Sequence, residues 1–113
     1  MRRALAAAVI AMIALSGCGN TDAGGNADEA IAITIDGDEI TPNGERIEVK
    51  TGETITLDVT SDRAGALHVH STPEQELEFD KGETTLELSI DTPGVVDVEE
   101  HEADVVVLQL EVR

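Results

Sequence analysis

Three histidines are the residues of this 113-residue chain best suited to chemistry. His68 and His70 are separated by a single residue, and His101 lies in an acidic run. On a β-strand, side chains two residues apart share a face with Cβ atoms about 7 Å apart, so these two imidazoles can converge on one ion. Imidazole combined with carboxylate suits Zn²⁺ or Cu²⁺. The same pair is also compatible with a plain polar sheet face, with Leu67 and Val69 on the core side.

Other reactive arrangements have little support in this sequence. No Ser, His and Asp residues occur at a recognisable catalytic spacing, and no Gly-rich loop joins a strand to a helix. Asp36-Gly37-Asp38 offers too few oxygen ligands for a calcium loop and favours a hairpin turn instead. The many carboxylates fall on the polar side of alternating segments, where solvation explains them. We therefore expect no enzyme.

The elements that must position the histidines follow a period-two alternation of apolar and polar residues. The clearest segment is 54–60, which places Ile55, Leu57 and Val59 on one face. Segment 105–112 is expected to turn four apolar side chains inward and to place Val105 and Val107 on the other face. The four inward residues are Val106, Leu108, Leu110 and Val112.

Turn signals separate these segments at regular intervals. They are Asp36-Gly37, Asn43-Gly44, Thr51-Gly52, Asp80-Lys81-Gly82 and Thr92-Pro93-Gly94. No segment has a helical stripe. The pattern predicts an all-β fold of seven to eight short strands, arranged as an antiparallel sandwich of two sheets, with a half-open barrel as the alternative.

The order of motifs resembles the cupredoxin-like domains of bacterial envelope proteins, including those related to the periplasmic iron-uptake lipoprotein component. The matching motifs are Ile47 to Thr60 with its V-x-x-G-E turn, His68-Val69-His70, Lys81-Gly82-Glu83-Thr84, Thr92-Pro93-Gly94, and the final Leu108 to Val112 strand. The resemblance covers about 33–112. It implies a Greek-key sandwich of cupredoxin type.

The resemblance also implies where ligands would lie. A copper cupredoxin has one histidine after its middle strand, matched here by His68 or His70, and a Cys, His and Met cluster in its last loop, where His101 stands. Blue copper requires a thiolate, and this loop has neither Cys nor Met, so blue-copper electron transfer is not expected. The resemblance instead brings His68, His70 and His101 together at one end of the sandwich to bind copper or zinc. A nearby carboxylate would complete the site, from Glu99, Glu100 or Glu102.

The N-terminus has the layout of a secretory signal peptide. A cationic Met1-Arg2-Arg3 precedes an uncharged apolar run, Ala4 to Leu15, which is too short to span a bilayer as a helix. Leu15-Ser16-Gly17-Cys18 resembles the bacterial lipobox. It implies that residues 1–17 are removed and that Cys18 carries lipid, such as palmitate. The mature chain would then be anchored to the extracytoplasmic face of the cell membrane.

Composition limits the remaining possibilities. Residues 18–30 are rich in Gly, Asn, Asp and Ala and are expected to form a flexible tether, followed by one domain over 31–113. The formal charge is −17, and loss of Arg2 and Arg3 leaves five basic against 24 acidic residues, or −19. Such a chain repels phosphate backbones, so no nucleic acid partner is expected. Two functions stay open: a metal-binding module, or a metal-free structural or protein-interaction module of the cell envelope.

Overall fold

Nine β-strands and no helix make up the regular structure of residues 29–113, the part of the chain that the computed structural model describes. The all-β prediction is therefore confirmed, with one strand more than the expected maximum. The expected signal peptide, Cys18 and most of the expected tether lie outside the described residues. Within residues 29–113 there is no helix of the length and apolar character needed to cross a membrane.

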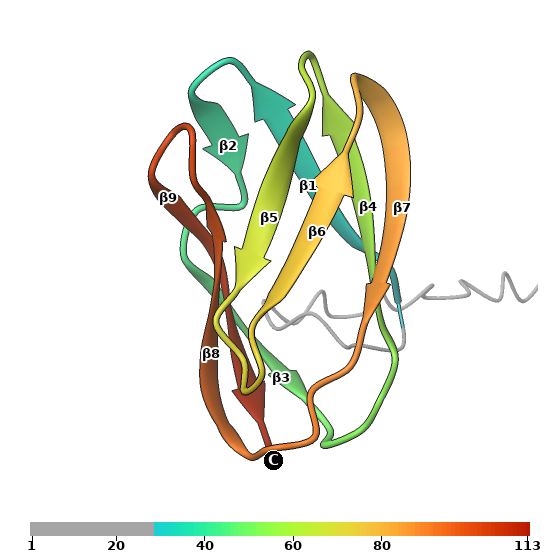
Figure 1. Cartoon of the computed structure of the whole chain (residues 1–113), viewed down its shortest axis with the longest axis vertical. Coiled ribbons are helices and arrows are strands. Elements are labelled where there is room, and N and C mark those ends of the chain that lie inside the picture. Colours follow the sequence, from blue (N-terminus) through green and yellow to red (C-terminus); the bar gives the residue numbers. More distant parts are fainter. Residues whose placement is uncertain (1–28) are drawn as a thin grey trace, which may run out of the picture.

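The strands form two sheets that pack face to face. The four-stranded sheet contains, in spatial order, β2 (Glu39–Thr41), β1 (Ile31–Asp36), β4 (Ile55–Ser61) and β7 (Gly82–Leu88). The five-stranded sheet contains β3 (Glu45–Val49), β9 (Val105–Val112), β8 (Gly94–Glu100), β5 (Gly65–Val69) and β6 (Gln75–Phe79). Figure 1 shows β8 and β9 along one side of the sandwich and β4 and β7 along the other.

Alternating side chains from both sheets fill the space between them. Ile55, Leu57 and Val59 of β4 are at most 1% exposed, as the alternation predicts. Leu67 and Val69 of β5, in the other sheet, are also fully buried. Because burying such a side chain contributes about 1.5–3 kcal/mol, this core holds the sandwich together without a disulfide.

Both sheets are mixed, so the prediction of a purely antiparallel sandwich is wrong in this detail. β1 pairs with β4 in parallel, with Ile33 opposite Val59, and β3 pairs with β9 in parallel, with Ile47 opposite Leu110. The reason is that the chain changes sheets between β2 and β3. Strands joined by such crossovers, unlike hairpins, can run in the same direction. The ninth strand is β2, which has only three residues and folds back on β1.

A β-bulge between β8 and β9 corrects the expected facing of the last strand. Val98 pairs with Leu108 and Glu99 with Val106, so Val107 is the extra residue. A bulge reverses the inward and outward alternation on one side of it. Val107 is accordingly fully buried, whereas Val106 is partly exposed.

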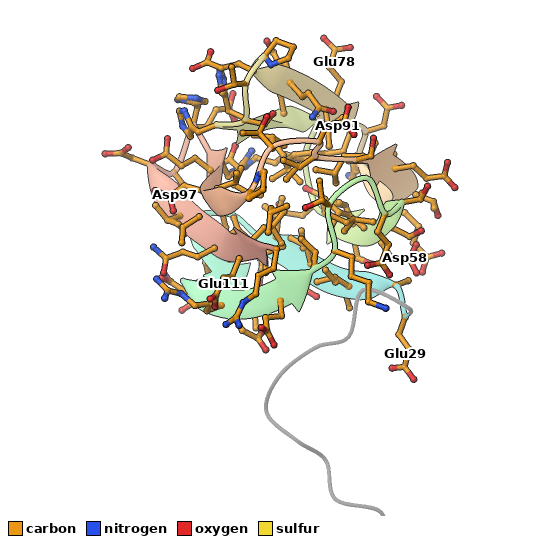
Figure 2. The ribbon with its side chains drawn as sticks, turned by 90° about the horizontal axis from the view of Figure 1, so that it is seen from below. Glu29, Asp58, Glu78, Asp91, Asp97 and Glu111 are labelled. Carbon is orange, nitrogen blue, oxygen red and sulfur yellow. The ribbon has the colours of Figure 1, made fainter. Side chains whose placement is uncertain are left out.

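The outward faces of both sheets are dominated by carboxylates. Asp58, Glu78, Asp97 and Glu111 all point away from the core in the view along the strands (Figure 2). The strong negative charge of the sequence is thus displayed around the whole sandwich and is not confined to one patch.

Candidate metal centre

His68 and His70 are presented on the outer face of the five-stranded sheet. His68 lies in β5 between two fully buried neighbours, Leu67 and Val69, so the strand alternation turns its ring outward. His70 follows the last residue of β5. Its backbone N–H donates a hydrogen bond of 2.9 Å to the carbonyl oxygen of Asp97 in β8, which keeps this residue aligned with the sheet.

His101 reaches the same face from the turn between β8 and β9. The carboxylate of Glu100 accepts hydrogen bonds from the backbone N–H groups of Ala103, at 2.8 Å, and Glu102, at 3.3 Å, and so closes this turn. Asp104 ends the turn with φ of 54°. Asp tolerates this left-handed conformation better than most residues with a Cβ atom. The turn therefore gives His101 a defined position.

The three imidazole rings lie together. The ring centroid of His68 is 4.8 Å from that of His70 in a stacked arrangement and 4.7 Å from that of His101 in an edge arrangement. The His70 and His101 centroids are 6.4 Å apart. The rings gather on the outward face of the five-stranded sheet, and not at one end of the sandwich as the resemblance implied.

Two glutamates lie among the rings. Glu74, in the turn between β5 and β6, approaches His68 Nε2 at 3.0 Å and His70 Nδ1 at 3.6 Å. Glu99, in β8, approaches His70 Nε2 at 2.9 Å. We refer to these five residues, His68, His70, Glu74, Glu99 and His101, as the His–Glu cluster.

The His–Glu cluster contains two compact ligand sets. His68, His70 and Glu74 form the β5 set, and His70, Glu99 and His101 form the β8 set. Within each set, one ligand atom per residue lies within 4.8 Å of the other two. His70 belongs to both sets.

The imidazoles and carboxylates of the cluster shift one another's pKa values. The hydrogen bond with Glu99 is the main cause of the raised pKa of His70; burial acts against it, and the negative charges of Glu99 and Glu74 add to the rise. The pKa of Glu74 is lowered, chiefly by its hydrogen bond with His68. Both shifts favour an imidazolium beside carboxylates, which is the arrangement that a divalent cation can replace.

Glu100, a predicted ligand, lies elsewhere. Its side chain is fully buried, because the alternation that turns Val96 and Val98 inward continues to this residue. Its Oε2 atom lies 3.0 Å from the guanidinium of Arg63. Burial raises the pKa of Glu100, but hydrogen bonds from Arg63 and from the β8–β9 turn outweigh it and the pKa is lowered. Glu100 therefore anchors the turn that carries His101, and its neighbour Glu99 is the carboxylate of β8 that approaches the rings.

Glu74 is the cluster residue that the sequence analysis did not identify. Val69 pairs with Gln75 across the β5–β6 hairpin, so the residues next to them, His70 and Glu74, also face each other. The turn is held by Ser71, whose hydroxyl donates to the carbonyl oxygen of Pro73 at 2.7 Å. The available signal was the short polar segment 70–74 between two alternating strands, which predicts that a hairpin returns residue 74 to the histidine pair.

The spacing of the ligand atoms fits a metal ion. Two ligands at about 2.0–2.1 Å from a tetrahedral Zn²⁺ lie about 3.3 Å from each other. The three His–Glu contacts of the cluster span 2.9–3.6 Å, which is close to this spacing, and all ligand atoms of each set lie within 4.8 Å of one another. A groove beside the cluster leaves it open to solvent. Its lining residues are Gly65, Ala66, His68, Glu76, Glu78, Glu100, His101 and Glu102.

Comparison with known proteins relates the fold to solved structures. No family model matches the sequence, and no curated protein matches it. A Cu(I) form of a mutant amicyanin is similar, with a TM-score of 0.56 and 16% identity over 74% of this chain and 82% of that chain. A reduced amicyanin mutant gives a TM-score of 0.55 and 17% identity over 77% of this chain and 85% of the other.

A third similar structure is a purple cupredoxin from Nitrosopumilus maritimus. Its TM-score is 0.51, with 14% identity over 74% of this chain and 99% of that protein. At such low identity the likeness concerns the fold alone. The part of the chain that the structure describes therefore has a cupredoxin-like β-sandwich fold.

Proposed function

We propose that this chain is a lipid-anchored, extracytoplasmic protein whose cupredoxin-like domain binds Cu²⁺ or Zn²⁺ through the His–Glu cluster. The observation that carries the proposal is the convergence of all three histidines of the chain with two carboxylates, from segments up to 33 positions apart. A polar sheet face needs no such convergence. Imidazole and carboxylate together are a ligand set that both metals accept.

The exposure of the cluster favours exchangeable binding over permanent storage. The side chain of His70 is 37% exposed and that of Glu74 is 63% exposed, so an incoming ligand can reach a bound ion. Asp97 and Glu76 add negative charge on the same face, which attracts divalent cations. Buffering or delivery of the ion fits this geometry.

We also propose that the domain binds metal without acting as a blue-copper electron carrier or as an enzyme. The only Cys and both Met residues of the sequence precede residue 19, so residues 29–113 offer no sulfur ligand. A blue-copper centre depends on a Cys thiolate. A Zn²⁺ or Cu²⁺ site made of imidazole and carboxylate needs no thiolate.

Support for the membrane anchor comes from the sequence alone. The lipobox-like Leu15-Ser16-Gly17-Cys18 follows a cationic start and an apolar run. Acylation of Cys18 would hold the domain at the membrane surface, and the high negative charge would keep it away from anionic headgroups. A bound ion would then be held in the envelope within reach of a membrane partner.

The test is calorimetric titration of the full chain, purified in a non-ionic detergent, with Cu²⁺ and with Zn²⁺. Every protein carries Cys18→Ser, which removes the only thiol. We expect tight binding that His70→Ala reduces by about 100-fold or more, with Cu²⁺ bound more tightly than Zn²⁺. The matched control is Glu87→Gln, an exposed carboxylate on β7 of the other sheet, compared with Glu74→Gln.

The two open functions give different results in this titration. If the cluster binds metal, Glu74→Gln weakens binding and Glu87→Gln leaves it unchanged. Equal, weak binding by all the proteins would mean that the surface carboxylates bind ions non-selectively. The His–Glu contacts would then be ion pairs of a metal-free envelope module.

A further inference from the structure

We infer that the cluster holds one ion at a time and that this ion alternates between the β5 set and the β8 set, with His70 as the ligand common to both. The inference rests on the proposed metal function and extends it. It assigns unequal roles to three histidines that the sequence alone treats as equivalent.

The contacts of His70 show why it is common to both sets. Its Nδ1 atom faces Glu74 at 3.6 Å, while its Nε2 atom faces Glu99 at 2.9 Å. The two nitrogens lie on different edges of the ring, so each edge is directed toward a different carboxylate. Each carboxylate comes with one further histidine, His68 on the β5 side and His101 on the β8 side.

A single site made of all three imidazoles is not what the geometry provides. Among residues 29–113, no group of ligand atoms mutually within 4.8 Å contains His68, His70 and His101 together. An ion bound by His70 therefore takes its second imidazole from one side or from the other.

Simultaneous occupation of both sets is disfavoured by the chemistry of the shared ring. A neutral imidazole offers one lone pair for a metal, because its other nitrogen carries a proton. Two ions on His70 would require removal of that proton. They would also place two double positive charges within one ring's width of each other. Both effects oppose the second ion.

Alternation has a functional consequence. An ion can be exchanged between the β5–β6 turn and the β8–β9 turn at His70. The exchange also moves the proton of this ring: Nε2 gives up its proton to solvent as the ion arrives there, and Nδ1 takes up a proton from solvent as the ion leaves it. The β5 set includes Glu74, which is 63% exposed, and the β8 set includes Glu99, which is 28% exposed. The histidines have the opposite order, with His68 25% exposed and His101 exposed, so both sets are open to an ion from solvent.

The test compares Cu²⁺ affinity and stoichiometry across histidine variants of the full chain, all in the Cys18→Ser background. His68→Ala removes only the β5 set and His101→Ala only the β8 set, so each is expected to lower affinity by about two- to fivefold. His70→Ala removes both sets and is expected to lower it by about 100-fold or more. The double variant His68→Ala/His101→Ala should match His70→Ala.

Electron paramagnetic resonance of the Cu²⁺-loaded chain gives an independent readout. We expect one Cu²⁺ per chain, two overlapping signals in the parent protein, and one of the two signals in each single variant. Circular dichroism of each metal-free variant verifies the fold. Equal losses for all three histidine variants would overturn the inference in favour of one three-imidazole site, and two ions per chain would overturn it in favour of a bridged pair. Absence of binding by the parent chain would refute the proposed function itself.

Discussion

The Nε2 atom of His70 lies 2.9 Å from Oε2 of Glu99, although the two residues are 29 positions apart. This contact joins the end of β5 to β8 on the outward face of the sheet. It also raises the pKa of the one histidine that both ligand sets share, so it links the fold to the proposed chemistry.

The His70–Glu99 contact predicts a pH dependence. Since the folded-state pKa of His70 is raised, its ion pair stabilises the fold below the ordinary imidazole pKa of about 6.5. That stabilisation is lost as the pH rises through the raised value. Metal affinity changes in the opposite direction, because the ion needs the neutral ring. NMR titration of the His70 ring should give a pKa above 6.5 that Glu99→Gln lowers. A measured His70 pKa at or below that of the unfolded chain would contradict this expectation.

The Arg63–Glu100 pair predicts a large loss of stability. Arg63→Met leaves the fully buried Glu100 without its cation, and we expect unfolding to become easier by about 3 kcal/mol. Because the pKa of Glu100 is lowered in the fold, this contribution is present above about pH 4.3 and is lost as the pH falls through the folded value.

Urea denaturation of the metal-free chain measures the Arg63 effect. The control is Arg46→Met, which removes an exposed guanidinium whose hydrogen bond to Gln109 is 3.4 Å long. Adding Glu100→Gln to Arg63→Met should restore part of the lost stability, since no buried charge is then left unpaired. Equal effects of the Arg63 and Arg46 variants would contradict the importance of the pair.

The large negative net charge predicts that added salt stabilises the folded state. With 24 acidic against seven basic residues, repulsion among exposed carboxylates opposes folding. Screening is weak at about 0.01 M salt and strong at about 1 M. If screening stabilises the fold by on the order of 1 kcal/mol, Tm would rise by about 4–8 °C for a domain of this size. Thermal melts in NaCl and in choline chloride should agree, because screening does not depend on the cation. A Tm that falls with salt would contradict the expectation.

The lipobox resemblance predicts the fate of Cys18. Expressed in a bacterium, the native chain should be found in the membrane fraction and, by mass spectrometry, begin at an acylated Cys18. Cys18→Ser should lose the acyl mass. Ser16→Ala, which keeps a small residue in the motif, should leave processing intact. Recovery of an unmodified Cys18 from the native chain would exclude lipidation.

Much of the fold was predictable because alternation is a local signal. The alternation over 54–60 predicts that Ile55, Leu57 and Val59 face the core, and all three are at most 1% exposed. The facing of Val106 and Val107 could not be predicted in this way, since one extra residue in a bulge reverses the alternation without changing composition. The parallel pairing of β1 with β4 also depends on a change of sheet, which a local pattern does not encode.

The site was predictable only in part. The same strand pattern that turns His68 outward turns Glu100 inward, but a carboxylate beside His101 suggests a ligand until its burial and its partner Arg63 are known. Glu74 depends on the register of a hairpin, and Glu99 on the pairing of β5 with β8. Contacts between distant segments thus decide which of the many carboxylates belong to the cluster. The relation to iron-uptake lipoproteins stays a prediction.

A crystal structure of the full chain grown with Zn²⁺, with anomalous data collected on both sides of the zinc absorption edge, tests the metal site most directly. We predict one anomalous peak about 2.0–2.1 Å from a ring nitrogen of His70, with Glu74 or Glu99 also bound. Peaks found only at carboxylates outside the cluster, with the His70–Glu99 contact still at 2.9 Å, would contradict the assignment.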